Sequence, residues 1–296
     1  MKRKQIVVVV AVVALMGYLF SLPVKGLIKP KEERTAPGQQ ARNTSAASAS
    51  VDVKAVSDPA KSAVGPDLSG KITELEQSLA KAATPADKQK LQLELAHAWD
   101  DANQQAPAAF YYRDLATATN GIENWIDAGN RFNDAFKFSQ DTTMQAAFVA
   151  NAIASFKKAM AVQADNLEAK TGLGIAYVNQ TSLGITDPEG GSPMQGIMLL
   201  RDVVAKDPNN WKANLNLGQF AMQSGQYPKA VERFKNMIAQ DTKQSKIEPY
   251  FYLAESYKQL GQKQEAIAAY EKCKELMPAD PAFGKRIDDY IKELKN

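Results

Sequence analysis

The sequence predicts an all-α protein, a superhelical α-solenoid of about five helix-turn-helix repeats with a flanking helix at each end. Three observations lead to this prediction. A small residue followed four positions later by an aromatic residue or leucine recurs five times between residues 89 and 280. Glycine or proline stands where the helices are expected to turn or end. Apolar stripes at helical spacing lie on both sides of the array, in residues 67–88 and 281–296.

The five copies align on the second helix of each expected pair. The small and large residues of this helix are Ala108 and Tyr112, Ala152 and Phe156, Gly196 and Leu200, Ala230 and Phe234, and Ala266 and Tyr270. Successive large residues are separated by 44, 44, 34 and 36 positions. We therefore place the repeats at residues 89–121, 122–166, 167–210, 211–246 and 247–280, and expect two of them to carry insertions.

Small residues also recur on the first helix of each copy. They are Ala96, Gly129, Gly174, Gly218 and Ala254. Only glycine or alanine leaves room where two helices cross closely, and the large residue of the second helix fills the gap toward the next repeat. Pro208 and Pro278 are expected to end second helices, since proline cannot continue a helix. Gly225 and Gly261 mark the turn between the two helices of a pair.

This pattern resembles the tetratricopeptide repeat (TPR) family, most closely in the last two copies. The resemblance implies that the first helices line a concave groove that binds other proteins. The whole chain is similar to membrane-anchored bacterial members that are associated with envelope assembly, secretion or protein maturation. The family's clamp for C-terminal carboxylates is not matched, because the corresponding positions here are acidic, apolar or glutamine.

The expected groove residues lie on the first helices. They are Asp101, Asn130, Asn133, Asp134, Ile175, Asn179, Leu215, Gln219, Met222, Gln223, Phe251 and Glu255. Their character changes along the array, from acidic and amide to apolar and amide. Such a surface suits a protein or peptide partner that presents an apolar helix or an extended segment.

The N-terminus predicts a single-pass membrane anchor in residues 1–28. Basic residues 2–4 precede a charge-free, mostly apolar run from Ile6 to Leu22, near the lower limit of about 17 residues for a spanning helix. The alternative is a cleaved signal peptide, for which Val24-Lys25-Gly26 is the one candidate site. The basic residues abutting the run favour a cytoplasmic N-terminus, although the positive charges on its two sides are nearly even. The anchor would then lie in the inner membrane, with the repeats in the periplasm or otherwise outside the cytoplasm.

Residues 29–66 are rich in alanine, serine, proline and threonine and predict a flexible linker. The stripe of residues 67–88 (Leu68, Ile72, Leu75 and Leu79) either caps the array or pairs with a second copy. The stripe of residues 281–296 (Phe283, Ile287, Ile291 and Leu294) fits a C-terminal cap. Glycine, proline and aspartate between residues 182 and 195 indicate a loop.

Composition argues against an enzyme, a cofactor site and a nucleic-acid binder. The net charge is +3 without a dense basic stripe, and the chain has one cysteine and one histidine. Glu94, His97 and Asp101 share a helix face, but a di-metal site needs a second such motif. Cys273 is expected to be a buried packing residue. The sequence thus indicates a tethered scaffold for partner proteins, with a self-assembling structural oligomer of the envelope as the alternative.

Overall fold

The computed structural model describes residues 51–185 and 192–295, and their regular structure is entirely helical. The helices are α2 (Val53–Ala63), α3 (Pro66–Lys81), α4 (Pro85–Asp101), α5 (Gln105–Thr119), α6 (Ile122–Phe138), α7 (Thr142–Val162), α8 (Leu167–Ser182), α9 (Pro193–Lys206), α10 (Trp211–Gln223), α11 (Tyr227–Ala239), α12 (Ile247–Gln259), α13 (Lys263–Leu276) and α14 (Pro281–Lys295). The predicted all-α fold class is confirmed.

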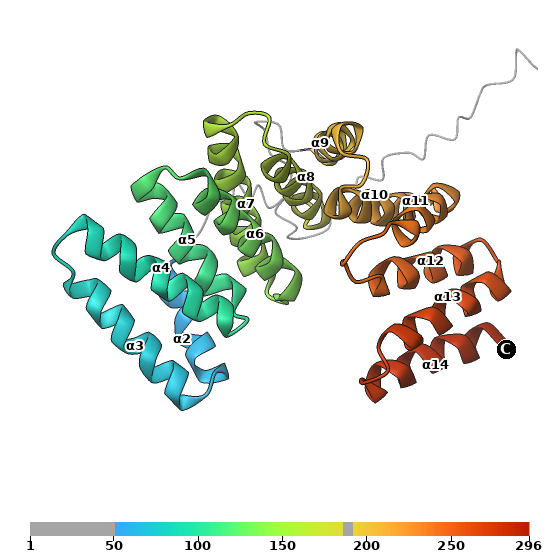
Figure 1. The fold of residues 1–296 in the computed structure, drawn as a ribbon, viewed down its shortest axis with the longest axis horizontal. Coiled ribbons are helices and arrows are strands. Elements are labelled where there is room, and N and C mark those ends of the chain that lie inside the picture. The colour runs from blue at the N-terminus through green and yellow to red at the C-terminus, as the bar shows by residue number, and fades with distance from the viewer. Residues whose placement is uncertain (1–50, 186–191, 296) are drawn as a thin grey trace, which may run out of the picture. The chain divides into compact units, whose positions relative to one another are not determined.

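The helices from α4 to α13 form five consecutive antiparallel pairs (Figure 1). Four pairs lie within the predicted repeat ranges, and the first begins earlier than predicted, at Pro85 instead of residue 89. We call the first helix of each pair an A helix (α4, α6, α8, α10 and α12) and the second a B helix (α5, α7, α9, α11 and α13). Each helix packs mainly on the helices next to it in sequence, and α8 also contacts α6 and α10. The two predicted insertions have different outcomes. The insertion in residues 122–166 lengthens α6 and α7. The other insertion belongs to the connection between α8 and α9, part of which lies outside the described residues.

The helix ends follow from local side-chain chemistry. Asn166 and Asn210 cap α8 and α10, each accepting a hydrogen bond from a backbone N–H three residues later at 2.9 and 3.0 Å. Gly225 and Gly261 adopt φ values of 72° and 73° at the turns after α10 and α12. Glycine reaches this left-handed region without the steric cost that other residues incur.

The small residues of the A helices make room for large residues of the B helices. A Cβ atom at Gly218 would lie 2.5 Å from the Phe234 ring, and one at Gly129 would lie 2.6 Å from the Phe156 ring. One such position was missed, because a Cβ atom at Gly172 would lie only 2.1 Å from Phe156. Phe156 therefore fills the space against its own A helix and against the A helix of the next repeat.

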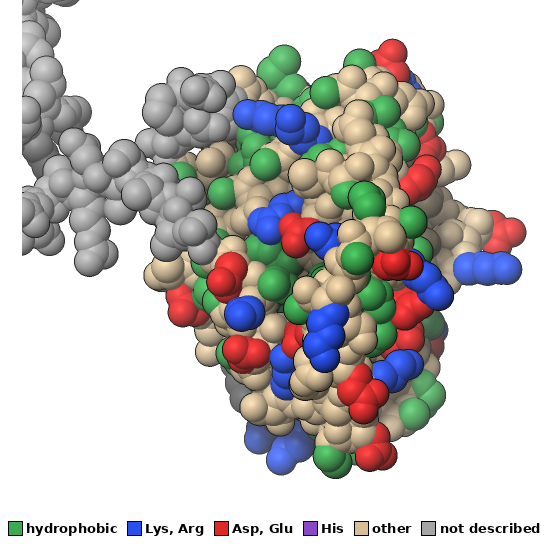
Figure 2. Space-filling view, turned by 90° about the vertical axis from the view of Figure 1, so that its left-hand side faces the viewer, with side chains coloured by type: hydrophobic (Ala, Val, Ile, Leu, Met, Phe, Trp, Pro, Cys, Tyr) green, Lys and Arg blue, Asp and Glu red, His purple; other side chains and the backbone are tan. Residues whose placement is uncertain are grey.

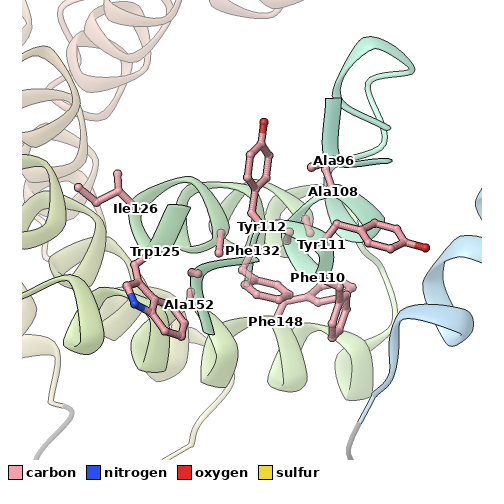
Figure 3. Packing of buried hydrophobic residues seen from close by; sticks show 14 of the residues in the cluster. Ala96, Ala108, Phe110, Tyr111, Tyr112, Trp125, Ile126, Phe132, Phe148 and Ala152 are labelled. Atoms are coloured by element: carbon pink, nitrogen blue, oxygen red, sulfur yellow. The ribbon is translucent and has the colours of Figure 1, made fainter. Parts of the chain in front are cut away.

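The core consists of three hydrophobic clusters along the array. The first joins α2 to α8, the second joins α8 to α10, and the third joins α10 to α14. Aromatic rings link neighbouring helices in the first cluster (Figure 3): Phe110 of α5 meets Phe132 of α6 edge-on at 5.0 Å, and Phe132 stacks on Phe148 of α7 at 6.3 Å. The core therefore runs along the array rather than gathering at one centre, as the interfaces between stacked repeats require.

The prediction that residues 29–66 form a flexible linker is wrong for its last part. Residues 53–63 form α2, which is capped by Asp52 and packs on α5 through Val56 and Ala60. Two apolar residues four positions apart give too narrow a stripe to stand out in an alanine-rich and serine-rich segment. The helix is stabilised by docking rather than by its own composition. The rest of the predicted linker, residues 29–50, lies outside the described residues.

The flanking segments also differ in detail from the prediction. Residues 67–88 are not one helix, because Thr84 caps a new helix that begins at Pro85. The stripe of α3 packs against the array itself, with Ile72 fully buried. Helix α14 covers the other end of the array through Ile287, Ile291 and Leu294. No helix between residues 51 and 185 or between 192 and 295 is long and apolar enough to cross a bilayer, and the predicted anchor in residues 1–28 lies outside these ranges.

A buried lysine joins α8 to α9 by ion pairs. Lys170 Nζ lies 3.1 Å from Asp165 Oδ1 and 3.0 Å from Asp202 Oδ2, and Lys206 also reaches Asp165. Hydrogen bonds from Lys170 are the main cause that lowers the pKa of both carboxyl groups. The side chain of Lys170 is only 11% exposed, so its charge depends on these partners.

We expect the Lys170 pairs to steepen the loss of stability in acid. A carboxyl group with a lowered pKa in the folded state binds fewer protons than in the unfolded chain. The carboxyl group therefore adds to the free energy of unfolding at a pH above its unfolded-state pKa of about 3.9. This contribution is lost as the pH falls through the folded-state pKa. Urea unfolding from pH 6 to pH 2 should show a shallower loss for Lys170→Met than for the native chain. Lys158→Met, at an exposed lysine of α7, serves as the control and should keep the native slope. Equal slopes in all three proteins would contradict the assignment.

Candidate protein-interaction surface

The A helices of the first two repeats carry a network of paired charges. Arg131 on α6 bonds Asp100 on α4 at 2.8 Å and Asp127 at 2.5 Å, and its guanidinium lies over the Tyr112 ring at 4.9 Å. Burial alone would lower the pKa of Arg131, but the hydrogen bonds and charge of Asp100 and Asp127 raise it overall. These carboxylates therefore stabilise the contact between α4 and α6, and they are not free for a ligand.

Three predicted groove residues form hydrogen bonds that link α6 to α8. Asn133 is only 5% exposed and donates to the backbone oxygen of Gly172 at 3.0 Å, while Asn179 donates to Asn133 at 3.4 Å. Asn130 donates to Glu168 at 3.0 Å. The prediction that Asn133 is exposed is wrong, because the amide satisfies a backbone group between two closely packed helices.

The prediction that Ile175 lines the groove is also wrong. Ile175 is 8% exposed and packs in the middle cluster with Ile197, Leu200 and Leu217. The cause is that α8 packs closely against three helices, α6, α7 and α9, and every residue from Ala169 to Tyr177 is buried. An A helix enclosed in this way has no wide face for a partner.

The remaining residues predicted for the first two repeats lie nearer the solvent. Asp101 is exposed at the end of α4, and Asp134 pairs with Lys137 at 3.3 Å. Acidic, basic and hydrophobic side chains are interspersed over the end of the array seen in Figure 2. Of these two acidic residues, Asp134 is already paired within the chain.

The A helices of the last two repeats carry a different surface. On α10, Leu215, Gln219 and Met222 form a half-buried row, which we call the α10 stripe, and Gln223 beside it is exposed. Helix α10 contacts α12 within the same hydrophobic cluster. Burial and then the charge of Glu248 raise the pKa of Tyr252 on α12, and the Gln219 side chain partly offsets the rise. The stripe is therefore continuous with the exposed face of α12.

Next to the stripe, α12 and α14 enclose a hollow of about 270 Å³. Its aromatic walls are Phe251, Tyr252, Phe283 and Tyr290, which we call the aromatic cup. Phe251 lies 5.7 Å from Tyr252 and 5.9 Å from Tyr290, measured between ring centroids. Glu248 and Arg286, which are both exposed, add one charge of each sign to the lining.

A hydrogen bond below the cup engages the last predicted groove residue. Tyr270 donates to Glu255, and Tyr270 also stacks on Tyr290 at 5.5 Å. Burial, followed by the interaction with Glu255, raises the pKa of Tyr270. The phenol therefore stays neutral and holds the Glu255 carboxylate, which supports the cup from below.

Comparison with known proteins agrees with this architecture. Residues 191–248 and 247–280 match two family models described as tetratricopeptide repeat. Among solved structures, TTC0263, a thermophilic TPR protein of Thermus thermophilus, is 21% identical over 68% of this chain and 97% of its own, with a TM-score of 0.53. The fold is a tetratricopeptide solenoid. No curated protein sequence matches the chain.

Two further tetratricopeptide structures are similar at the level of the fold. PilW, a widely conserved type IV pilus biogenesis factor, is 17% identical over 70% of this chain and 85% of its own, with a TM-score of 0.52. The Cut9–Hcn1 hetero-tetramer of the APC/C is 15% identical over 82% of this chain and 43% of its own, with a TM-score of 0.52. The matching family models support a tetratricopeptide repeat protein and indicate no catalytic family.

Sequence reasoning missed three of the four walls of the aromatic cup. The sequence places Phe283 in the apolar stripe of a capping helix and indicates no role for Tyr252 and Tyr290. In the tetratricopeptide stack, α14 takes the position of a further A helix, so it both covers the core and contributes to the exposed face. The seven-residue spacing of Phe283 and Tyr290, two turns along one helix face, is the signal that could have found them.

The two candidate sites considered for other chemistry are Cys273 and the group Glu94, His97 and Asp101. Cys273 is fully buried, and its Sγ atom lies 3.5 Å from the backbone oxygen of Ile247. Burial raises the pKa of this thiol to about 12. Cys273 is thus a packing residue, as predicted. Glu94, His97 and Asp101 are exposed on α4, and His97 contacts the edge of Tyr112 at 6.3 Å.

Proposed function

We propose that this chain is a membrane-tethered tetratricopeptide scaffold that binds a partner protein over the α10 stripe and the aromatic cup. The aromatic cup carries the proposal, because it combines four aromatic side chains, both charge signs and an open hollow on adjoining A-type helices. Aromatic residues in apolar hollows supply most of the binding energy of protein interfaces. The partner would insert an apolar side chain from a helix or an extended segment.

The N-terminal sequence supports a proposal for where the chain acts. We propose that residues 1–28 anchor the chain in the inner membrane and that the repeats lie outside the cytoplasm, where they serve envelope assembly, secretion or protein maturation. Basic residues 2–4 directly before the apolar run support this orientation. The fold-level similarity to PilW, which is described as a pilus biogenesis factor, is consistent with a role in the envelope.

The orientation predicts the behaviour of a reporter fused after Asn296. A phosphatase that is active only after export should be active in the fusion. A reporter that fluoresces only in the cytoplasm should stay dark in the same place. The reverse pair of results would mean that the repeats face the cytoplasm.

Site-specific photocrosslinking tests the binding surface in the full chain. A photoreactive amino acid replaces the exposed Gln223 beside the α10 stripe, and a matched variant carries it at the exposed Lys158 of α7. We expect one protein to be captured at position 223 and not at position 158. Phe283→Ala should reduce that capture. Equal capture at both positions, or capture that is independent of Phe283, would exclude this surface.

A further inference from the structure

Phe138 is a large apolar side chain that the fold leaves in solvent. It is the last residue of α6 and is 76% exposed, more than any other large hydrophobic side chain in the described parts of the chain. It lies away from the α10 stripe and the aromatic cup. A single exposed apolar side chain is ordinary on a protein surface, so its surroundings decide its meaning.

Phe138 stands at the edge of an apolar hollow of about 530 Å³. Helix α2 lines one side with Val56, Pro59 and Ala60, and α7 lines another with Met144 and Phe148. The turn between α4 and α5, the start of α5 and the end of α6 line the rest and add polar side chains such as Asn103 and Gln104. We call Phe138 and this hollow the Phe138 patch. A projecting aromatic ring and a cavity for apolar groups thus lie side by side on one surface.

This arrangement is complementary to itself. In a two-fold symmetric dimer, the same patch of each copy faces the other. If a residue of one copy contacts a second residue of its partner, the reciprocal contact also forms. We propose that two copies of this chain pair through the Phe138 patch, with Phe138 of each copy entering the hollow of the other. The interface would bury one aromatic ring and one α2 face from each side.

The charges beside the patch favour a second copy over a strongly charged partner. Lys54, Asp58 and Lys137, each next to a lining residue in the chain, and Asp141, two positions after Ser139, are all exposed. Within one copy, Asp58 pairs with Lys61 at 3.4 Å and Lys137 with Asp134 at 3.3 Å, so the rim of the patch has no excess of either sign. When two copies of this surface meet, charges of both signs therefore lie around the contact. An anionic membrane surface would instead call for an excess of basic residues around the apolar group.

The proposal also gives α2 a role. This helix lies outside the repeat pattern and is attached to α5 by a narrow apolar face, and Lys61 pairs with Glu76 of α3, which also accepts from Tyr111 of α5 at 3.1 Å. Without α2 the hollow would have no wall on that side. The helix therefore completes the surface that receives Phe138.

The oligomeric state of the full chain in detergent tests the proposal. Light scattering after size exclusion should report two protein chains per particle for the native protein and one for Phe138→Asp. Met198→Asp, at a side chain that is 62% exposed on α9, is the matched control and should remain dimeric. A native monomer, or a dimer that survives Phe138→Asp, would overturn the proposal. Because Phe138 is so exposed, both variants should keep the native melting temperature.

Cysteine crosslinking then locates the interface. Cys273 is fully buried with a raised pKa, so it should react little, and a single added cysteine reports on its own position. With a bismaleimide, Gln140→Cys next to the patch should give crosslinked dimers in membranes, and Ala154→Cys on the exposed surface of α7 should not. Adding Phe138→Asp should lower the Gln140→Cys dimer at least tenfold. An unchanged yield would place the contact elsewhere.

Discussion

Gly172→Ala is expected to lower the free energy of unfolding by about 2 kcal/mol, although alanine is the better helix former. The added Cβ atom would lie 2.1 Å from the Phe156 ring, and that ring is fully buried between α6 and α8. Overpacking of a rigid core costs about 1–3 kcal/mol. The contact with Phe156 is so short that we expect a cost near the upper end of this range, about 3 kcal/mol. The higher helix propensity of alanine recovers about 1 kcal/mol of it.

The matched control for this prediction is Gly70→Ala. Gly70 lies inside α3 with nothing within 4 Å of an added Cβ atom, so the same substitution should stabilise by about 1 kcal/mol. Urea unfolding measures both variants, and the two should differ by about 3 kcal/mol. The double variant Gly172→Ala with Phe156→Leu should recover part of the loss. Equal stabilities of Gly172→Ala and Gly70→Ala would show that the Phe156 ring can move aside.

Phe283→Ala is expected to weaken partner binding about ten- to a hundredfold. Removing an aromatic side chain from the centre of an interface commonly costs more than 1 kcal/mol, and each 1.4 kcal/mol corresponds to a factor of ten in Kd. Phe283 forms one wall of the aromatic cup and is half-buried in the free protein. Its truncation should therefore affect binding more than folding.

Lys285→Ala on the same helix is the control for the cup. Lys285 is exposed and does not line the hollow, so the substitution should leave both Kd and the melting temperature near the native values. Calorimetric titration with the captured partner and a thermal melt of each variant separate the two effects. If Phe283→Ala binds like Lys285→Ala, the partner uses another surface. If it unfolds the protein, Phe283 belongs to the core.

Scaffolding by a tetratricopeptide array and pairing through the Phe138 patch are compatible. The α10 stripe and the aromatic cup belong to α10, α12 and α14, and the patch belongs to α2 and to the ends of α5, α6 and α7. Loss of either interface by mutation should leave the other intact. A variant that lost both would indicate a folding defect instead.

Local rules were enough to predict the helices and their pairing from the sequence. A helix crossing needs a small residue, and the space it leaves needs a large one, so Gly218 with Phe234 and Gly129 with Phe156 are visible as spacings. The turn glycines Gly225 and Gly261 and the helix-ending prolines follow the same kind of rule. Each of these features depends on a few neighbouring residues, which is why the all-α solenoid was predictable.

The exposed face of the array was decided only by the tertiary structure. Asn133 and Ile175 occupy A-helix positions like those of the α10 stripe, yet both are buried, because α8 packs closely against α6, α7 and α9, whereas α10 packs mainly on α9 and α11. Helix α2 is stable through docking on α5, a contact between segments about fifty residues apart along the chain. Phe283 and Tyr290 meet Phe251 and Tyr252 because α14 continues the stack. The sequence determined which residues can pack closely, and the stacking of whole repeats determined which of them remained exposed to a partner.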